Sequence, residues 1–212
     1  MIRIMIADDH AIVRQGLAKI LEKNGEMKVV AEHDNGVDAL NWIRTHDCDV
    51  ALIDISMPGM NGIDLLKQLR EIKPHLPVLV VSIYAEDQYA VRLIKAGASG
   101  YLTKGCSPAT LLKGVTRVAS GKKYISTAVS EMLANEVGSP DGKISHETLS
   151  DREYQIFLML AAAKTVSEIA EGLALSGKTI STYRNRILGK MHLRNNAELM
   201  RYAIENHLAP SP

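Results

Sequence analysis

The chain has 212 residues, 46% of them hydrophobic and 23% charged, and its 25 basic and 24 acidic residues leave a formal net charge of +1. This composition is typical of a folded chain, and at roughly 150 residues per domain the length favours one large or two small domains. A pI of about 7.8 excludes a uniformly basic nucleic-acid-binding chain, because such domains usually have a pI above about 9. The longest apolar run, near residues 77–83, is too short to span a membrane, and two cysteines are too few for a disulfide framework. We therefore expect a cytoplasmic protein without membrane contact.

Five short runs rich in β-branched residues alternate with helical patterns over the first 120 residues. The predicted strands are residues 2–7, 28–31, 50–53, 78–81 and 100–102. This alternation predicts a parallel sheet covered by helices on both faces, that is, a doubly wound (βα)5 or flavodoxin-like α/β fold. Because such sheets bind ligands at the carboxyl ends of their strands, we expect the functional site of this domain there.

The alternation stops at Gly121, where the chain takes on the composition of a linker. Residues 128–137 have the pattern of an amphipathic helix, and residues 138–142 are dense in turn formers. The last third has no strand pattern and begins with a capping box, followed by four helical segments. The predicted organisation is a domain at 1–120, a partly helical linker at 121–147 and a small all-α four-helix domain at 148–212.

Three carboxylates follow strands that are neighbours in a doubly wound sheet. Asp8 and Asp9 follow the first predicted strand, and Asp54 follows the third. At ~4 Å and an effective dielectric of ~20, each like-charged pair costs about 4 kcal/mol, so the group needs a proton or a divalent cation. A few hard oxygen ligands, with room for water and a phosphoryl group, suit Mg²⁺. For any one aspartate alone, a helix cap or a turn is the simpler interpretation.

Two more polar side chains are predicted at the same rim. Ser82 ends the fourth strand, and Lys104 follows the fifth. A carboxylate nucleophile, a metal site, a hydroxyl donor and a fixed cation are what phosphoryl transfer to an aspartate requires. These residues, with the segments at 54–62 and 97–104, resemble the receiver domain of two-component response regulators over residues 1 to about 120.

The receiver resemblance implies Asp54 as the phosphoacceptor, with phosphate supplied by a histidine kinase or a small phosphodonor. It implies that Lys104 holds the phosphoryl oxygens, that Ser82 closes on them, and that Tyr101 swings inward as the readout. Many receivers place proline directly after the lysine, whereas Gly105 stands there in this chain.

The same resemblance implies a ligand set for Mg²⁺ or another divalent cation. Asp9, Asp54 and the backbone carbonyl of Ser56 would bind the ion directly. Asp8 would act through a water molecule or through the shared electrostatic field.

An acid-free stretch between Gly172 and Ala197 carries five basic residues. We expect a helix here whose inward side chains include Ile180, Tyr183 and Ile187. The residues then turned outward, or flanking that face, are Lys178, Ser181, Thr182, Asn185, Arg186 and Gly189. Short polar, amide and guanidinium side chains suit base edges and phosphates, although a solvated helix face is the simpler alternative.

The last third of the chain resembles the LuxR-type helix-turn-helix over roughly residues 148–208. The segments that carry the resemblance are residues 149–153, 166–170, 176–180 and 190–191. Joined to a receiver, this module implies the NarL/FixJ class of response regulators, and the Thr-Tyr-Arg sequence at 182–184 is similar to the UvrY/GacA branch of that class.

The LuxR resemblance implies a scaffold helix at 166–173 and a recognition helix at 176–191. The implied DNA contacts are Lys178, Thr179, Ser181, Thr182, Asn185, Arg186 and Lys190. Many members have lysine in place of Ser181 and histidine in place of Tyr183. The DNA sequence that better-known relatives bind therefore cannot be assumed for this chain. The last helix, at 197–207, is interpreted either as a dimer contact or as part of the module's core.

The main hypothesis is a DNA-binding transcription regulator switched by phosphorylation of Asp54, and not an enzyme that turns over a metabolite. Phosphorylation would shift an existing equilibrium toward a homodimer that binds double-stranded promoter DNA, and RNA polymerase is a further candidate partner. One alternative is an aspartate-nucleophile phosphatase, although such enzymes commonly carry a second acid where Ser56 stands. The other is a protein-interaction module whose last helices bind a partner rather than DNA.

Overall fold

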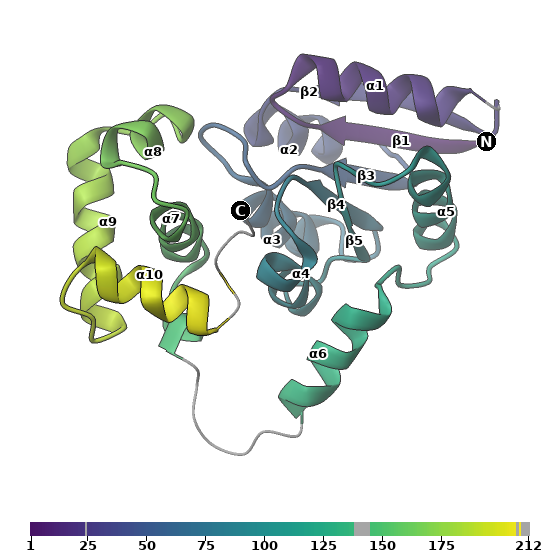
Figure 1. Ribbon diagram of the computed structural model, residues 1–212. Coiled ribbons are helices and arrows are strands. Elements are labelled where there is room, and N and C mark those ends of the chain that lie inside the picture. The colour runs from purple at the N-terminus through teal and green to yellow at the C-terminus, as the bar shows by residue number, and fades with distance from the viewer. Residues whose placement is uncertain (24, 138–144, 207, 209–212) are drawn as a thin grey trace. The chain divides into compact units, whose positions relative to one another are not determined.

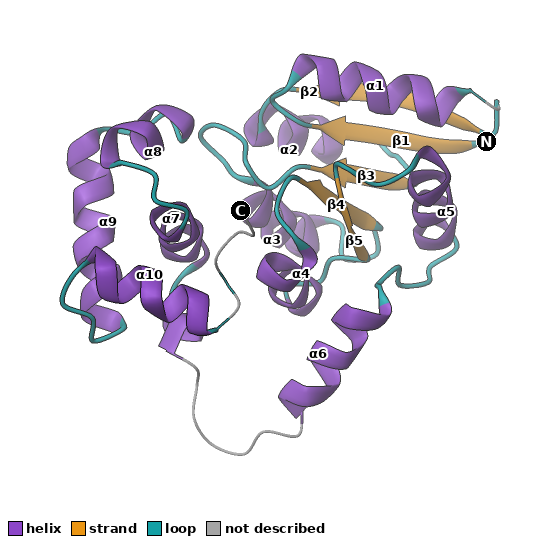
Figure 2. Cartoon of the chain, viewed as in Figure 1, coloured by secondary structure: helices purple, strands orange, loops and turns teal. Residues whose placement is uncertain are grey.

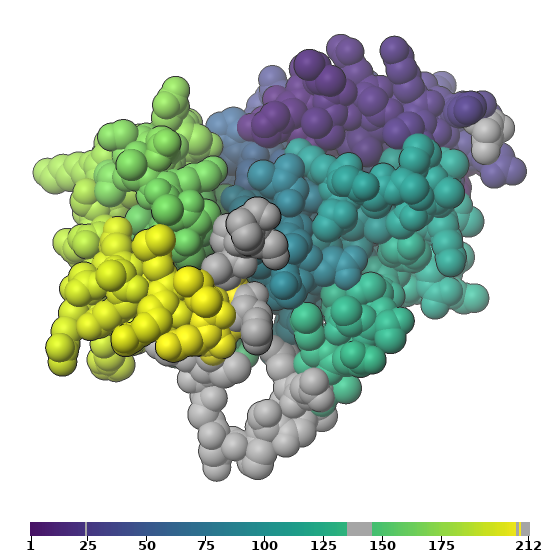
Figure 3. Space-filling view, viewed as in Figure 1, coloured from purple at the N-terminus to yellow at the C-terminus, as the bar shows by residue number. Residues whose placement is uncertain are grey.

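The computed structural model describes residues 1–212 except 24, 138–144, 207 and 209–212 (Figure 1). The chain forms two compact units that divide between Leu133 and Ala134, termed here the N-terminal and C-terminal units and drawn in space-filling form in Figure 3. None of the described helices is long and apolar enough to cross a membrane.

The N-terminal unit is built on a parallel five-stranded sheet in the order β2-β1-β3-β4-β5 (Figure 2). Its strands are β1 (Ile2–Ala7), β2 (Met27–His33), β3 (Val50–Ile53), β4 (Val78–Ser82) and β5 (Gly100–Thr103). The predicted flavodoxin-like fold is confirmed, and its ligand crevice lies where the strand order reverses, between β1 and β3. Strand β2 is longer than the predicted 28–31 because its ladder with β1 continues through the polar residues Glu32 and His33.

Helices cover both faces of this sheet, with α1 beside α5 and α2 beside α3 (Figure 1). Their bounds are α1 (Ala11–Glu22), α2 (Gly36–Thr45), α3 (Gly62–Ile72), α4 (Glu86–Lys95) and α5 (Pro108–Ala119). The side chains of Asn35, Asn61 and Ser107 accept hydrogen bonds from N–H groups in the first turns of α2, α3 and α5, which explains where these helices begin.

Helix α3 begins in direct contact with the end of β3. A Cβ atom at Gly62 would lie 2.0 Å from the backbone oxygen of Asp54, so only glycine fits at this position. The Gly62 N–H also donates to the Ile55 carbonyl at 2.9 Å. The loop that carries Asp54 is therefore held tightly against the start of α3.

The segment after α5 pairs with the free edge of the sheet. The Tyr124 N–H donates to Ser99 at 2.8 Å, and the Tyr101 N–H donates to Tyr124 at 3.3 Å. Helix α6 (Thr127–Val137) follows and confirms the helix predicted at 128–137. The predicted turn-rich segment at 138–142 lies outside the described residues.

The described part of the C-terminal unit after α6 is helical, as predicted. A 3-10 turn, η1 (Ser145–Thr148), precedes α7 (Asp151–Ala161), α8 (Val166–Gly172), α9 (Gly177–Lys190) and α10 (Asn196–Glu205). Helix α7 packs against α9 and α10, and α8 packs against α9, around the fully buried side chains of Phe157, Ile180, Ile187 and Leu199. Both α7 and α8 begin with a capping box, one of which the sequence predicted at Ser150 and Glu153.

Two details of the C-terminal unit differ from the sequence prediction. The last helix was predicted at 197–207, but it begins at Asn196, where the side chain of Asn195 caps it; it extends to Glu205, and residue 207 lies outside the described residues. Tyr183 was predicted to face inward, but it is only half-buried because it lines a hollow on the outer side of α9.

Candidate metal centre and nucleic-acid interface

The adjacent ends of β1 and β3 bring two buried carboxylates together. The Asp54 N–H donates to the Ala7 carbonyl at 2.8 Å, which fixes the end of β3 beside β1. Asp8 is 1% exposed and Asp54 is 2% exposed. One carboxylate oxygen from each of Asp8, Asp9 and Asp54 and one His10 nitrogen all lie within 4.8 Å of one another. The structure therefore places the three predicted carboxylates in one crevice.

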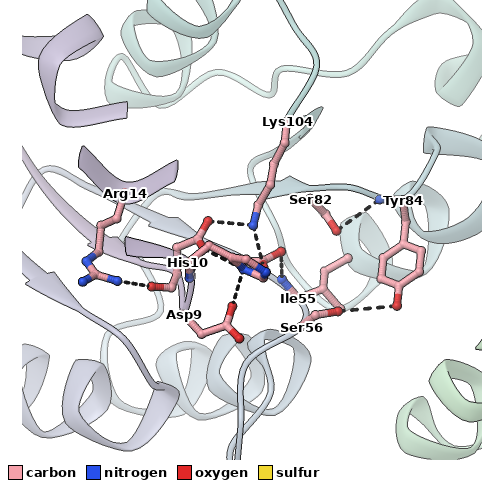
Figure 4. A network of polar contacts seen from close by, with 10 residues as sticks. Asp9, His10, Arg14, Ile55, Ser56, Ser82, Tyr84 and Lys104 are labelled. Carbon is pink, nitrogen blue, oxygen red and sulfur yellow. Dashed lines mark hydrogen bonds and ion pairs between the residues drawn. The ribbon is translucent and has the colours of Figure 1, made fainter. Parts of the chain in front are cut away.

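Lys104 supplies a positive charge to this crevice from the end of β5 (Figure 4). Its Nζ atom lies 2.8 Å from Oδ2 of Asp8 and 2.8 Å from Oδ2 of Asp54. Burial raises the pKa of Asp54 above its ordinary value, although Lys104 acts in the opposite direction. Burial also opposes the charge on Lys104, but the two neighbouring carboxylates outweigh it and raise the pKa of this lysine.

The donor set fits a divalent cation. Three carboxylates face one ammonium group, so the crevice carries an excess of negative charge beside closely spaced oxygen atoms. Mg²⁺ prefers hard oxygen ligands of this kind. The fourth predicted ligand, the backbone carbonyl of Ser56, stays a prediction; the Ser56 hydroxyl lies 3.5 Å from the hydroxyl of Tyr84.

Sequence reasoning missed His10 as a neighbour of the carboxylates. Its Nδ1 atom lies 2.7 Å from Oδ1 of Asp9, and its backbone N–H donates to Oδ1 of Asp8 at 2.9 Å (Figure 4). Its position directly after the two aspartates that follow the first strand was the available signal. His10 thus orients both carboxylates.

Ser82 and Tyr101 lie on neighbouring strands and are both buried. The Tyr101 hydroxyl donates to the backbone carbonyl of Tyr84 at 2.8 Å, so this ring lies inward in the structure. The Tyr84 N–H donates to the Ser82 hydroxyl at 3.4 Å. Burial raises the pKa of Tyr84 and of Tyr101, so both phenols stay protonated and able to donate hydrogen bonds. Tyr84, which sequence reasoning also missed, connects the predicted switch residues.

Most of the predicted DNA-contact residues lie on the accessible side of α9. Its exposed members are Lys178, Ser181, Thr182, Asn185, Arg186 and Lys190, while Thr179 is half-buried. A shallow hollow of about 320 Å³ on this side is lined by Ser176, Lys178, Thr179, Thr182, Tyr183 and Arg186. Hydroxyl, ammonium and guanidinium groups thus gather on one surface, which suits contact with phosphates and base edges.

Two basic side chains of α9 make contacts within the C-terminal unit. Lys190 Nζ lies 2.6 Å from Oε2 of Glu153 in α7. Arg184 Nε donates to Oδ1 of Asn196 at 2.6 Å. Lys190, one of the predicted DNA contacts, is therefore engaged differently from Lys178 and Arg186.

Comparisons with known proteins match both units. Residues 4–116 match the response regulator receiver domain, and residues 147–203 match bacterial regulatory proteins of the luxR family. The chain is 35% identical over 209 residues to response regulator UvrY of Escherichia coli strain K12, covering 98% of this chain and 96% of UvrY. It is 36% identical over 207 residues to response regulator GacA of Pseudomonas aeruginosa, covering 97% of each chain.

Solved structures of RcsB are similar over nearly the whole chain. RcsB from Salmonella enterica serovar Typhimurium, bound to promoter rprA in the presence of the phosphomimetic BeF3⁻, has a TM-score of 0.64 at 27% identity and covers 95% of this chain and 97% of its own. A structure of two RcsB dimers bound to two parallel DNAs has a TM-score of 0.59 at 30% identity, and the match covers 96% of this chain and 98% of the RcsB chain. The predicted class and the likeness to UvrY and GacA are confirmed. The chain belongs to the NarL/FixJ class of response regulators, in which a receiver domain is joined to a LuxR-family DNA-binding domain.

Proposed function

We propose that Asp54 accepts a phosphoryl group from a histidine kinase or a small phosphodonor, and that this promotes homodimerisation and promoter binding. The observation that carries the proposal is the position of Lys104, which lies 2.8 Å from the buried carboxylates of both Asp8 and Asp54. A cation fixed beside a buried carboxylate is placed to hold the oxygens of an incoming phosphoryl group. The RcsB structures that contain DNA support the output step.

Both oxygens of the Asp54 carboxylate are held before transfer. Oδ1 accepts a hydrogen bond from the Ile55 N–H at 2.7 Å, and Oδ2 accepts one from Lys104 at 2.8 Å. One of these oxygens attacks phosphorus, and the bond between phosphorus and the donor's leaving atom breaks with its electron pair remaining on the donor. Mg²⁺, held by Asp9, Asp54 and the Ser56 carbonyl, with Asp8 acting through a water molecule or the shared electrostatic field, would neutralise charge on the phosphoryl oxygens. Lys104 then moves from the carboxylate to those oxygens.

The loop after β4 provides a route from the phosphoryl group to the surface. Ser82 closing on the phosphoryl oxygens would release the Tyr84 N–H, and Tyr84 also holds the Tyr101 hydroxyl. Phosphorylation would thereby shift the population between two arrangements of this loop. We place this switch in the cytoplasm, where promoter DNA and RNA polymerase are accessible.

Replacing Asp54 with asparagine tests the phosphoacceptor. We expect Asp54→Asn to abolish acid-labile labelling by a small phosphodonor in the presence of Mg²⁺, while Asp87→Asn, an exposed aspartate at the start of α4, keeps it. Full labelling of Asp54→Asn would overturn the assignment. The protein is not proposed as a turnover enzyme: labelling should stop at one phosphoryl group per chain, and sustained release of phosphate from a general phosphoester would favour the phosphatase alternative.

DNA binding by α9 separates the regulator from a protein-interaction module. We expect the wild-type chain to select a duplex from random DNA, more strongly with a phosphodonor than without one. Binding should weaken steeply as salt rises and should be strongly reduced in Arg186→Ala, whose side chain is exposed on α9. Retention of a protein partner with no selection of DNA would instead support the interaction module.

A further inference from the structure

Lys190 stands at the C-terminal end of α9, and its charge is turned toward α7. Its Nζ atom lies 2.6 Å from Oε2 of Glu153. The Glu153 side chain is 5% exposed, whereas that of Lys190 is 43% exposed. The contact therefore joins a buried carboxylate to a partly exposed ammonium, across the packing between α7 and α9.

Glu153 is fixed in place by its own helix. It is the third residue of α7 and belongs to the capping box, in which its Oε2 atom accepts a hydrogen bond from the Ser150 N–H at 2.8 Å. Burial opposes its ionisation, but the hydrogen bonds from Lys190 and Ser150 outweigh burial and lower the pKa of Glu153. At neutral pH Lys190 thus faces an immobile negative charge.

Helix geometry places Lys190 far from Lys178 on α9. At about 100° per residue, Lys190 lies about 120° around the helix from Lys178 and about 40° from Arg186. At 1.5 Å per residue, Lys190 is also about 18 Å along the axis from Lys178. Recognition helices contact base edges mainly with their N-terminal residues, so Lys190 is at the far end.

We infer that Lys190 is a positioning residue that ties the end of α9 to the capping box of α7, and that it is not a phosphate contact. Glu153, an acidic residue in a different helix, then controls DNA affinity by fixing the angle at which Lys178 and Arg186 meet the duplex. The inference rests on DNA binding by α9, which the wild-type chain tests separately in the same assay.

The variant Glu153→Gln distinguishes a phosphate-contacting Lys190 from a positioning Lys190, because the two roles predict opposite changes in DNA affinity. If Lys190 contacts phosphate, removing its acidic partner frees the ammonium and takes a negative charge away from a polyanion, so DNA binding tightens or stays the same. If Lys190 is a positioning residue, binding weakens, and we expect a loss of about tenfold, equivalent to about 1.4 kcal/mol. Glutamine keeps the capping box, because its amide oxygen accepts the same bond from the Ser150 N–H.

The experiment uses the full chain and a duplex that the wild-type protein has selected from random DNA. Dissociation constants are measured over a series of salt concentrations for Glu153→Gln, Lys190→Gln and their double variant. Lys178→Gln is the reference for a phosphate contact, and Glu168→Gln is the matched control, because Glu168 holds the same capping-box position in α8. NMR amide signals of α9 confirm that each variant is folded.

We expect Lys178→Gln to lower the slope of log K against log salt by about 1, as the loss of one phosphate contact does. Lys190→Gln and Glu153→Gln should each weaken binding without changing this slope, and the double variant should lose no more than either single one. Glu168→Gln should bind like the wild type. A slope lowered by about 1 in Lys190→Gln, or undiminished affinity in Glu153→Gln, would overturn the inference. Failure of the wild-type chain to bind any duplex would refute the proposed function instead.

Discussion

Replacing Lys104 with methionine should destabilise the N-terminal unit strongly. The side chains of Lys104, Asp8 and Asp54 are 9%, 2% and 2% exposed, and the single ammonium group lies 2.8 Å from both carboxylates. Removing one partner of a buried ion pair leaves an uncompensated buried charge, which costs about 3–5 kcal/mol. We therefore expect the free energy of unfolding to fall by about this amount at neutral pH without divalent cations.

Trp42 makes this loss measurable in the full chain. It is the single tryptophan of the sequence and lies in α2, so its fluorescence during urea unfolding reports the N-terminal unit. The matched control is Lys73→Met, because Lys73 pairs with Asp47, whose side chain is 85% exposed. An exposed ion pair contributes little, so this control should lose far less stability. Equal losses in the two variants would refute the reasoning from burial.

The pH dependence of the loss has a definite sign. Burial already raises the pKa of Asp54, and removing Lys104 raises it further because the opposing cation is gone. When the pKa of a carboxyl group is higher in the folded than in the unfolded state, the group contributes its full stabilisation below its unfolded-state pKa, near 3.8. That contribution is lost as the pH rises through the folded-state pKa. The deficit of Lys104→Met should therefore be small near pH 4, grow toward neutral pH and shrink again when Mg²⁺ is added. A deficit that stays constant with pH would show that lost packing, and not charge, is the cause.

Three further outcomes follow from named contacts. Gly62→Ala should destabilise the N-terminal unit by about 1–3 kcal/mol in the same urea assay, because its Cβ would meet the Asp54 oxygen, whereas Gly16→Ala, which meets no atom within 4 Å, should be neutral or slightly stabilising. Asp9→Asn should weaken Mg²⁺ binding by roughly tenfold or more in calorimetry, since it removes one of three carboxylates; unchanged affinity would exclude Asp9 as a ligand. The pKa of Glu153 is lowered in the folded state, so its contribution to stability should be lost as the pH falls from about 4.5 through its folded-state pKa. In Glu153→Gln, the free energy of unfolding, followed by NMR signals of α7, should therefore decrease less over this acidic range.

The fold and the crevice could be predicted because their signals are local. All residues of β3 and β4 are buried, and buried parallel strands appear in the sequence as continuous apolar runs. Once strands and helices alternate, the handedness and order of the sheet leave few topologies, and the carboxyl ends of β1 and β3 must meet. Asp8 and Asp54, which are 46 positions apart in the sequence, could therefore be placed in one site from local sequence patterns alone.

The detailed hydrogen bonding of the crevice could not be predicted in the same way. Whether Lys104 contacts Asp54 alone or both buried carboxylates depends on side-chain geometry across β1, β3 and β5. Tyr84 gave no sequence signal, because its importance comes from a backbone carbonyl that accepts the Tyr101 hydroxyl. Helical periodicity likewise predicted that Tyr183 faces inward, but periodicity does not show how far the neighbouring helices cover a side chain, and Tyr183 is only half-buried.

The charge pattern of the acid-free stretch between Gly172 and Ala197 also depends on contacts that the sequence does not show. The acid-free stretch carries five basic residues, of which the sequence predicted Lys178, Arg186 and Lys190 as DNA contacts, but a count along the sequence ignores partners from other helices. Lys190 pairs with Glu153, and Arg184 is held by Asn196, which leaves Lys178, Arg186 and Arg194 without a side-chain partner among the described contacts. Neutralising each of these three should lower the salt slope of DNA binding by about 1, whereas Arg184→Gln should behave as Lys190→Gln does and leave it unchanged. Five equal reductions would mean that DNA displaces both internal partners, and that all five charges of the acid-free stretch are available to phosphates.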